Sequence, residues 1–147
     1  MTANWCRAQG LPVVRTEGKG YIEDMVCAVK VLEEGGPLVV SVCDIPCLTP
    51  AIVSTIIRAY TGSGMDALST WVPARLIRTG RDALPYHENI RGEEACPAGV
   101  NILRGNHIGA EQEEFFFVLD EPRLALNVNT PEDLARAESF LCNNPAS

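Results

Sequence analysis

Residues 37–44 read PLVVSVCD, an apolar run that ends at a single carboxylate, Asp44. The run is continuous rather than alternating, which is typical of a strand buried on both faces in a parallel sheet. In open sheets of this kind, ligands bind beyond the carboxyl ends of the strands. Asp44 is therefore a candidate ligand of Mg²⁺, which usually takes one or two protein carboxylates. The alternative is a structural role, in which Asp44 caps the following turn.

Helices and strands alternate around this run. The spacing of apolar residues predicts a helix over residues 21–34, ended by Gly35 and Gly36. A second helix is predicted from Pro50, with Thr49 as its N-cap and a loop over residues 61–64 after it. Its residues expected to face the core are Ile52, Val53, Ile56, Ile57 and Tyr60.

Short β-branched or aromatic runs predict the strands 11–16, 67–72, 98–103, 114–120 and 124–129. The segment 73–96 lacks periodicity, and it carries Arg75, Arg78, Arg81 and Arg91, so we interpret it as a long irregular insertion.

The last predicted helix begins at Pro131, with Thr130 as N-cap and Asp133 in a position that resembles a capping box. Its expected inner stripe is Leu134, Ala137, Phe140 and Leu141. The order of elements predicts an α/β sandwich with a largely parallel sheet, formed by residues 1–147 as a single domain.

Composition narrows the class of protein. The 147 residues are 46% hydrophobic and 21% charged, as in an ordinary globular domain. A net charge of −7 argues against a nucleic-acid surface. The N-terminal residues do not resemble a signal peptide, and no apolar window reaches the roughly 18 residues of a membrane span, so we expect a cytoplasmic protein.

The six cysteines are scattered and form no C-x-x-C pair. A zinc site or a redox pair is therefore not expected. We expect most of the cysteines to be small buried residues, with Cys43 and Cys47 packing beside Asp44 as bystanders.

A glycine-rich loop, Gly18, Lys19 and Gly20, leads directly into the first predicted helix. Such a loop lets the backbone approach an anionic ligand at a helix N-terminus, although a simple turn has the same composition. The spacing of a Walker motif is absent.

Two further segments combine small or amide side chains at strand ends. Asn127 and Asn129 precede the last helix and are either ligands of a metal shell or parts of a local turn. Gly99, followed by Asn101, either permits close approach of a ligand or marks a β-bulge.

Four of these segments together resemble one family: GKGYIED (18–24), PLVVSVCDIP (37–46), CPAGVNIL (96–103) and VLDEPRLALNVNTPEDLARAE (118–138). Their order and spacing are similar to those of archaeal adenosylcobinamide-phosphate guanylyltransferases. These belong to a wider group with molybdenum-cofactor guanylyltransferases and sugar-phosphate nucleotidyltransferases. The resemblance runs from Leu11 to Glu138.

The resemblance implies a Rossmann-like nucleotidyltransferase three-layer sandwich. It implies Mg²⁺-dependent transfer of GMP from GTP to adenosylcobinamide phosphate, a step of cobalamin biosynthesis. By resemblance, Asp44 is the catalytic metal ligand and Asn129 assists it, Gly18, Lys19 and Gly20 contact the nucleotide, and Gly99 and Asn101 contact the acceptor.

One departure from the family pattern is large. The family opens with a strand, a loop of the type G-G-x-G-T-R-M and a lysine-proline pair, none of which occurs after Met1. We therefore expect the chain to match the C-terminal two thirds of the family domain and to bind GTP poorly alone. Self-association, or a partner chain that supplies further strands, is expected at the open sheet. The alternatives are another nucleotidyltransferase, for molybdenum cofactor or sugar phosphate, and a non-catalytic remnant that binds a partner chain.

Overall fold

The computed structural model describes residues 2–77 and 86–144. The chain divides into two compact units, one of Met1–Leu38 with Arg104–Glu111 and one of Val39–Leu103 with Gln112–Ser147. No helix in the described ranges is both long and apolar enough to cross a membrane. Arg78 and Arg81 of the predicted arginine-rich segment lie outside the described residues.

The first unit contains the helices α1 (Thr2–Ala8) and α2 (Tyr21–Leu32) and the short 3₁₀ turn η2 (Gly105–His107). Helix α2 confirms the predicted helix, but it ends at Leu32, because Glu33 adopts a left-handed backbone conformation (φ 54°) two residues before the glycines. The strand predicted over residues 11–16 is wrong. These residues have no regular structure, because a strand needs a hydrogen-bonded neighbour and none pairs with them among the described residues.

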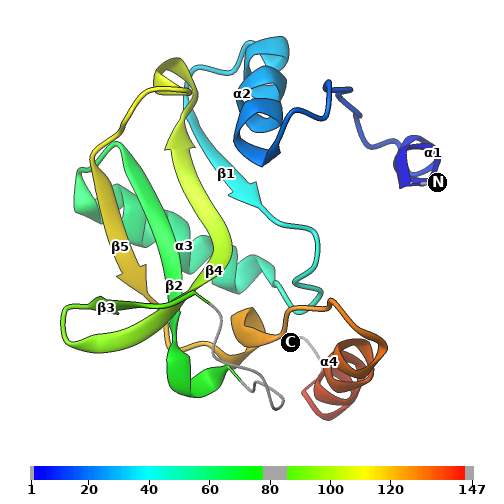
Figure 1. Ribbon diagram of the computed structural model, residues 1–147, viewed down its shortest axis with the longest axis vertical. Helices are drawn as coiled ribbons and strands as arrows, with labels where there is room; N and C mark the ends of the chain where they lie inside the picture. The colour runs from blue at the N-terminus through cyan, green and yellow to red at the C-terminus, as the bar shows by residue number, and fades with distance from the viewer. Residues whose placement is uncertain (1, 78–85, 145–147) are drawn as a thin grey trace. The chain divides into compact units, whose positions relative to one another are not determined.

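The second unit is built on a five-stranded sheet in the order β1-β4-β2-β5, with β3 paired to β4 (Figure 1). The strands are β1 (Pro37–Ser41), β2 (Ala67–Pro73), β3 (Glu88–Ile90), β4 (Glu93–Arg104) and β5 (Glu114–Val118). The first residues of β1 and the last of β4 continue into the other unit.

Strand directions confirm part of the sequence prediction. β2 and β5 are parallel, as expected, whereas β4 runs antiparallel to both β2 and β3. The cause of the β3–β4 arrangement is local: Arg91 (φ 55°) and Gly92 (φ 92°) form a two-residue turn with two positive φ angles, as in a type I′ hairpin. Residues 73–96 are thus not wholly irregular, since they contain η1 (Ala74–Leu76), β3 and the start of β4.

Strand β1 corrects a second expectation. Its residues alternate between exposed and half-buried, so β1 is not buried on both faces. The strand lies at one edge of the described sheet, where only one neighbour, β4, covers its backbone. It also stops at Ser41, three residues before Asp44, which therefore lies in a loop.

The main core lies between the sheet and helix α3 (Pro50–Ser63), which runs behind the strands in Figure 1. Thr49 caps α3 as predicted, and its side-chain oxygen accepts a hydrogen bond from the Ile52 amide. The helix extends through residues predicted as a loop and ends at Gly64, which has φ 70°. Ile52, Ile56 and Tyr60 are buried as expected, whereas Ile57 is 42% exposed.

Two elements close the unit, the 3₁₀ turn η3 (Pro122–Ala125) and the helix α4 (Pro131–Asn143). The strand predicted over residues 124–129 is wrong, because η3 buries Leu124 through a turn that the Glu121 side chain stabilises. In α4 the predicted capping box between Thr130 and Asp133 is present.

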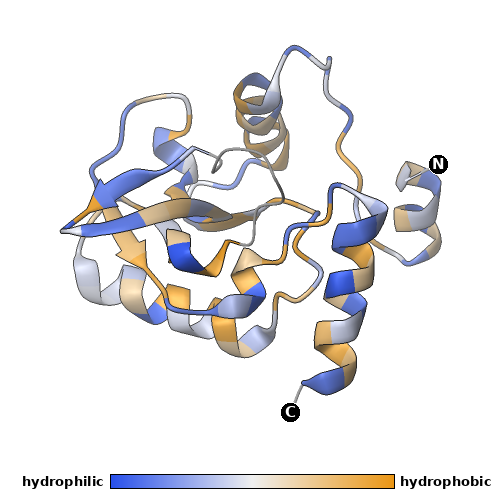
Figure 2. Ribbon diagram, turned by 60° about the horizontal axis from the view of Figure 1, so that its bottom comes forward, coloured by the Kyte–Doolittle hydropathy of each residue, from blue (hydrophilic) through white to orange (hydrophobic). Residues whose placement is uncertain are grey.

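The predicted inner stripe of α4 is only half right. Ala137 is 2% exposed, but Leu134 and Leu141 are exposed to 47% and 37%. Hydrophobic and hydrophilic residues both occur along the whole length of the helix (Figure 2). The apolar residues of α4 therefore do not all face the core.

Candidate functional site: a cavity between the end of strand β1 and helix α4

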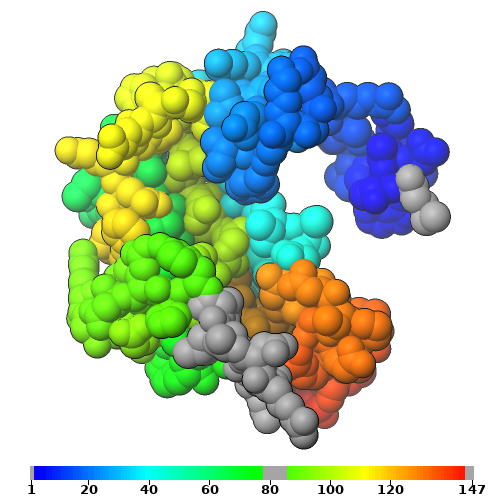
Figure 3. All heavy atoms as spheres, viewed as in Figure 1, coloured from blue at the N-terminus to red at the C-terminus, as the bar shows by residue number. Residues whose placement is uncertain are grey.

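A cavity of about 980 Å³ lies within the second unit. Its walls come from the loop after β1, from the middle of β4, from η3 and from one side of α4. The loop after β1, in cyan, and the segment leading into α4, in orange, lie side by side (Figure 3). The polar residues of the lining are Asp44, Arg75, Tyr86, Asn127, Asn129, Asp133, Arg136, Ser139, Asn143 and Asn144.

Asp44 reaches the cavity from the loop that follows β1. Its backbone oxygen accepts a hydrogen bond from the amide of Val128 at 2.8 Å, which fixes the loop to the segment before α4. Its side-chain oxygen Oδ1 is buried and has no hydrogen-bond partner among residues 2–77 and 86–144. A buried carboxylate oxygen without a donor is costly, because it has lost its water without replacement. Oδ1 therefore does not cap the next turn, and it is placed to accept a cation.

Two amide side chains line the same cavity. Asn129 Nδ2 donates a hydrogen bond to Asn127 Oδ1 at 3.2 Å, which leaves the Asn129 side-chain oxygen as an acceptor. The backbone amide of Asn129 donates to Asp133 Oδ2 at 3.2 Å. The backbone of Asn129 is thus fixed by Asp133 in the first turn of α4.

Asp133 joins the residues at the start of α4 through hydrogen bonds to both of its carboxylate oxygens. Its Oδ2 accepts from the backbone amide and the hydroxyl of Thr130, both at 2.9 Å, in addition to Asn129. Its Oδ1 accepts from Arg136 Nη2. The hydrogen bonds from the Thr130 side chain, the Asn129 amide and Arg136 lower the pKa of Asp133 below its ordinary value. Because both of its oxygens are occupied, Asp133 acts as a scaffold rather than as a metal ligand.

Gly99 lines the cavity beside the end of β1. It has φ 73° and lies where the β2–β4 register shifts between Ser69 and Trp71, so the β-bulge interpretation is confirmed. A Cβ at Gly99 would come within 2.5 Å of Val42 Cγ2. Asn101, in contrast, is not part of the lining and pairs with Ser69 across the sheet.

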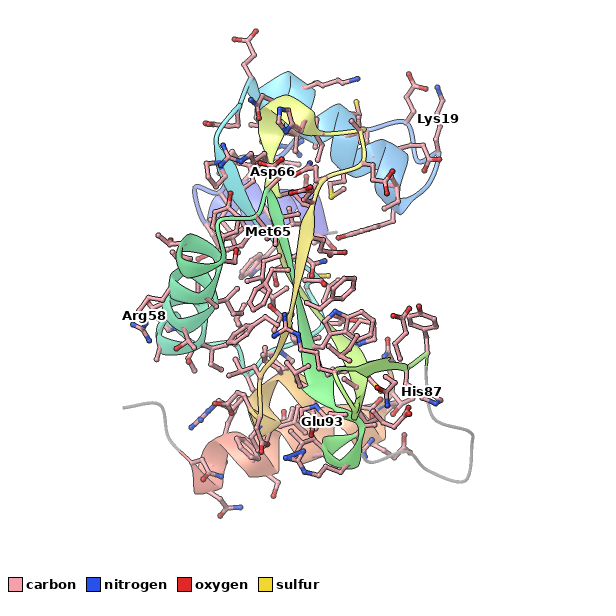
Figure 4. The ribbon with its side chains drawn as sticks, turned by 90° about the vertical axis from the view of Figure 1, so that its left-hand side faces the viewer. Lys19, Arg58, Met65, Asp66, His87 and Glu93 are labelled. Carbon is pink, nitrogen blue, oxygen red and sulfur yellow. The ribbon has the colours of Figure 1, made fainter. Side chains whose placement is uncertain are left out.

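The loop of Gly18, Lys19 and Gly20 belongs to the other unit. The amides of Gly18 and Lys19 both donate to Asp24 Oδ1, at 3.1 and 3.4 Å. Lys19 points outward and pairs with Glu17 at 2.5 Å (Figure 4). The loop is therefore organised by an internal carboxylate, and its amides face that carboxylate.

The donor set around Asp44 fits Mg²⁺. One carboxylate oxygen without a partner and an amide oxygen from Asn129 are hard ligands, and Mg²⁺ keeps several waters or phosphate oxygens besides. Over residues 2–77 and 86–144, no cluster of three or more His, Cys, Asp or Glu side chains forms a metal site. The residues therefore suit a cation that a phosphate ligand helps to hold, not a closed protein cage.

The cysteines do not form a site. All six are free thiols, and two of them, Cys47 and Cys96, are buried. Cys6 and Cys27 are half-buried, whereas Cys43 and Cys142 are exposed, so the expectation that most cysteines are buried is wrong. Burial raises the pKa of the Cys47 thiol, which keeps it protonated and unreactive at neutral pH.

The contribution of α4 to the lining was not expected from the sequence. Asp133, Arg136, Ser139 and Asn143 are spaced by three or four residues and so share one face of the helix. The sequence shows this polar row, but it does not show that the row faces a cavity. Arg75 also lines the cavity, and it pairs with Glu93 at 3.2 Å and Asp120 at 2.5 Å, neither of which is part of the lining.

Comparison with known proteins shows the family and the fold of this chain. Residues 1–96 match the family model of the MobA-like NTP transferase domain, and the chain belongs to that family. Solved structures share the fold, among them the following two. A hypothetical transferase from Thermus thermophilus has TM-score 0.62 and 15% identity, over 80% of this chain and 71% of that one. Molybdopterin-guanine dinucleotide biosynthesis protein A from Archaeoglobus fulgidus has TM-score 0.60 and 16% identity, over 97% of this chain and 74% of that one.

Among individual relatives, the chain is similar to the adenosylcobinamide-phosphate guanylyltransferase of Methanocaldococcus jannaschii. The two are 32% identical over 133 residues, which cover 90% of this chain and 63% of the relative. The chain thus spans somewhat less than two thirds of the length of this curated relative. The α/β nucleotidyltransferase fold expected from the sequence is confirmed.

Proposed function

We propose that this chain takes part in guanylyl transfer from GTP to adenosylcobinamide phosphate, with Mg²⁺ held by Asp44 and Asn129. The observation that carries the proposal is the buried, unpartnered Oδ1 of Asp44 in a large cavity. The identity to a guanylyltransferase of that acceptor supports the choice of substrates.

In this reaction an oxygen of the acceptor phosphate attacks the α-phosphorus of GTP, and the bond from that phosphorus to the β-phosphate oxygen breaks. Pyrophosphate leaves, and no bond to the protein is formed. Bound Mg²⁺ would supply the positive charge that the crowded phosphates need. The protein contributes positioning, which can account for a large part of such a rate enhancement.

Each described residue of the site has a definite part in that positioning. Asp44 presents Oδ1 to the cation, and its backbone bond to Val128 keeps the loop in place. Asn127 orients the amide of Asn129 so that the oxygen of Asn129 faces away from Asn127. Gly99 lets β4 approach Val42, which carries the chain toward Asp44.

The remaining roles of the proposal rest on the resemblance to the family. Gly18, Lys19 and Gly20 contact the nucleotide, and Asn101 belongs to the acceptor side. The exposed edge strand β1 receives a further strand from a second copy or from a partner chain. A cytoplasmic location agrees with GTP as a substrate and with the free thiols of all six cysteines.

Transfer of label from GTP labelled at the α-phosphate tests the proposal directly. The purified chain, with Mg²⁺, is given adenosylcobinamide phosphate, molybdopterin or a sugar 1-phosphate in separate reactions. Because we expect the chain to bind GTP poorly alone, GTP is supplied in large excess. We expect slow transfer with label only in the cobinamide product, and a further loss of at least ~100-fold in rate for Asp44→Asn. Asp66→Asn is the matched control, because Asp66 precedes β2 and does not line the cavity (Figure 4).

Two results would overturn the proposal. Transfer to molybdopterin or to the sugar phosphate alone would assign the site to another acceptor. Absence of both transfer and Mg²⁺-dependent GTP binding would show that this chain does not carry the activity.

A further inference from the structure

Helix α4 turns its polar row toward the cavity instead of a complete apolar stripe. Arg136, Ser139 and Asn143 line the cavity and are also open to solvent, and Leu134 and Leu141 are exposed as well. A helix that packs only for stability places its apolar residues inward. A helix that instead presents polar residues to a cavity departs from this pattern, and such departures are typical of functional surfaces.

Arg136 brings a positive charge into the cavity close to the proposed metal end. Its guanidinium binds Asp133 Oδ1, and the other oxygen of Asp133 binds the backbone amide of Asn129. A single carboxylate therefore links Arg136 to a residue proposed to face Mg²⁺. Helical side chains point back toward the N-terminus, which is consistent with this placement.

The second arginine of the described lining is less suited to bind an anion. Arg75 pairs with two carboxylates, those of Glu93 and Asp120, which exceed its own charge. Arg136 shares the cavity with Asp133, whose oxygens are also engaged by Thr130 and Asn129. The link through Asp133 to the backbone of Asn129 therefore favours Arg136 as the residue that receives a phosphate near the proposed metal end.

We infer that Arg136 binds the phosphate monoester of the acceptor, and that Ser139 and Asn143 hydrogen-bond to its uncharged polar groups. This inference rests on the proposed function and specifies the acceptor side of the same cavity. The acceptor phosphate carries close to two negative charges at neutral pH and must approach the triphosphate, which is also strongly negative. A guanidinium offers two parallel donors to such a group and lowers the repulsion.

A structural explanation also exists and has to be separated from the binding role. Arg136 and Asp133 are three residues apart, and such exposed pairs add little to helix stability. A purely structural role would change the unfolding of α4 and would not depend on a phosphate in the ligand. The difference between a phosphorylated ligand and its unphosphorylated form isolates the binding role.

Calorimetry with adenosylcobinamide phosphate and with adenosylcobinamide lacking the phosphate gives that difference. We expect the wild-type chain to bind the phosphorylated compound at least ~10-fold more tightly, and Arg136→Gln to reduce this preference below ~3-fold. Arg136→Lys keeps the charge but loses the paired donors, so an intermediate ratio is expected. Arg58→Gln is the matched control, because Arg58 projects from the outer side of α3 (Figure 4).

The result that overturns the inference is a wild-type preference that survives in Arg136→Gln, or a wild-type chain without any preference for the phosphorylated compound. Thermal unfolding of each variant shows whether α4 remains folded. The proposed function fails separately: a chain that discriminates the two acceptors through Arg136 but transfers no guanylyl group refutes the reaction and leaves the binding role in place.

Discussion

Val42 and Gly99 meet at the end of β1 without room for a side chain between them. The amide of Val42 donates to the carbonyl oxygen of Gly99 at 2.9 Å, and a Cβ on Gly99 would lie 2.5 Å from Val42 Cγ2. Asp44 follows Val42 by two residues and reaches the same cavity. The contact between Val42 and Gly99 therefore helps to fix the position of the Asp44 carboxylate.

We expect Gly99→Ala to lower the free energy of unfolding by about 1–3 kcal/mol, because alanine is strained at φ 73° and collides with Val42. Urea denaturation measures the change. Gly62→Ala is the control: it lies in α3, its Cβ would meet nothing within 4 Å, and it should stabilise the chain by about 0.4–1 kcal/mol. Equal stability of Gly99→Ala and the wild type would show that the contact does not constrain β4.

Asp44→Asn should separate stability from binding. The substitution removes a charge from a buried oxygen without a donor, so we expect the melting temperature without ligand to stay the same or to rise. The increase in melting temperature caused by Mg²⁺ with GTP should disappear, because this increase depends on binding to the folded state. Thermal scans with and without Mg²⁺ and GTP measure this increase. An increase in the variant equal to that of the wild type would show that Asp44 is not part of the metal site.

Thr130→Ala should weaken the start of α4. The Thr130 hydroxyl accepts a hydrogen bond from the Asp133 amide at 3.2 Å, and loss of such a cap costs about 1 kcal/mol. Thr61→Ala serves for comparison, since the Thr61 hydroxyl only donates to the Ile57 carbonyl within its own helix. Chemical denaturation of both variants gives the two values. A cost for Thr130→Ala no larger than for Thr61→Ala would contradict a capping role.

The lowered pKa of Asp133 makes the stability of the chain depend on pH. Because its pKa is lower in the folded chain than in the unfolded chain, its charged form stabilises the fold above the unfolded-state pKa. That stabilisation is lost as the pH falls through the folded-state pKa. The difference in unfolding free energy between the wild type and Asp133→Asn should be largest near neutral pH and should shrink toward pH ~3. A difference that is constant from pH ~7 to ~3 would disprove this.

Thiol reactivity checks the burial of the cysteines. Cys43 and Cys142 are exposed, whereas Cys47 is 1% exposed and its pKa is raised by burial. A brief iodoacetamide pulse followed by peptide mass spectrometry should label the exposed pair first. Cys47 should react only after unfolding in urea. Equal labelling of Cys43 and Cys47 in the folded chain would contradict the packing of the loop after β1.

Helices that carry local signals were predictable from the sequence. Thr49 with Pro50 and Thr130 with Pro131 place the starts of α3 and α4 correctly, because a capping side chain bonds to backbone only two or three residues away. Strands depend on distant neighbours. The β-branched run 11–16 has no partner strand among the described residues, and residues 124–129 form η3 and a loop instead.

The site was also partly predictable from the sequence. Asp44, Gly99 and Asn129 were singled out by their positions at strand ends, and the fold brings all three to one cavity. Asn101 does not join them, because it lies two residues beyond the bulge at Gly99, where it pairs with Ser69 of β2 and does not line the cavity. Arg136 was missed, since the direction in which a helix faces depends on tertiary packing rather than on its own periodicity.

The hydrogen-bond network of Asp133 separates two kinds of position in the cavity wall. Some can be substituted without disturbing the start of α4, and others cannot. Its two oxygens hold the helix start, the Asn129 backbone and Arg136 together, so any replacement alters all three at once. Ser139, Asn143 and Asn144 line the same cavity one or more turns further along, outside that network. A laboratory that wishes to redirect the chain to a new acceptor would diversify these three positions and leave Asp133 untouched.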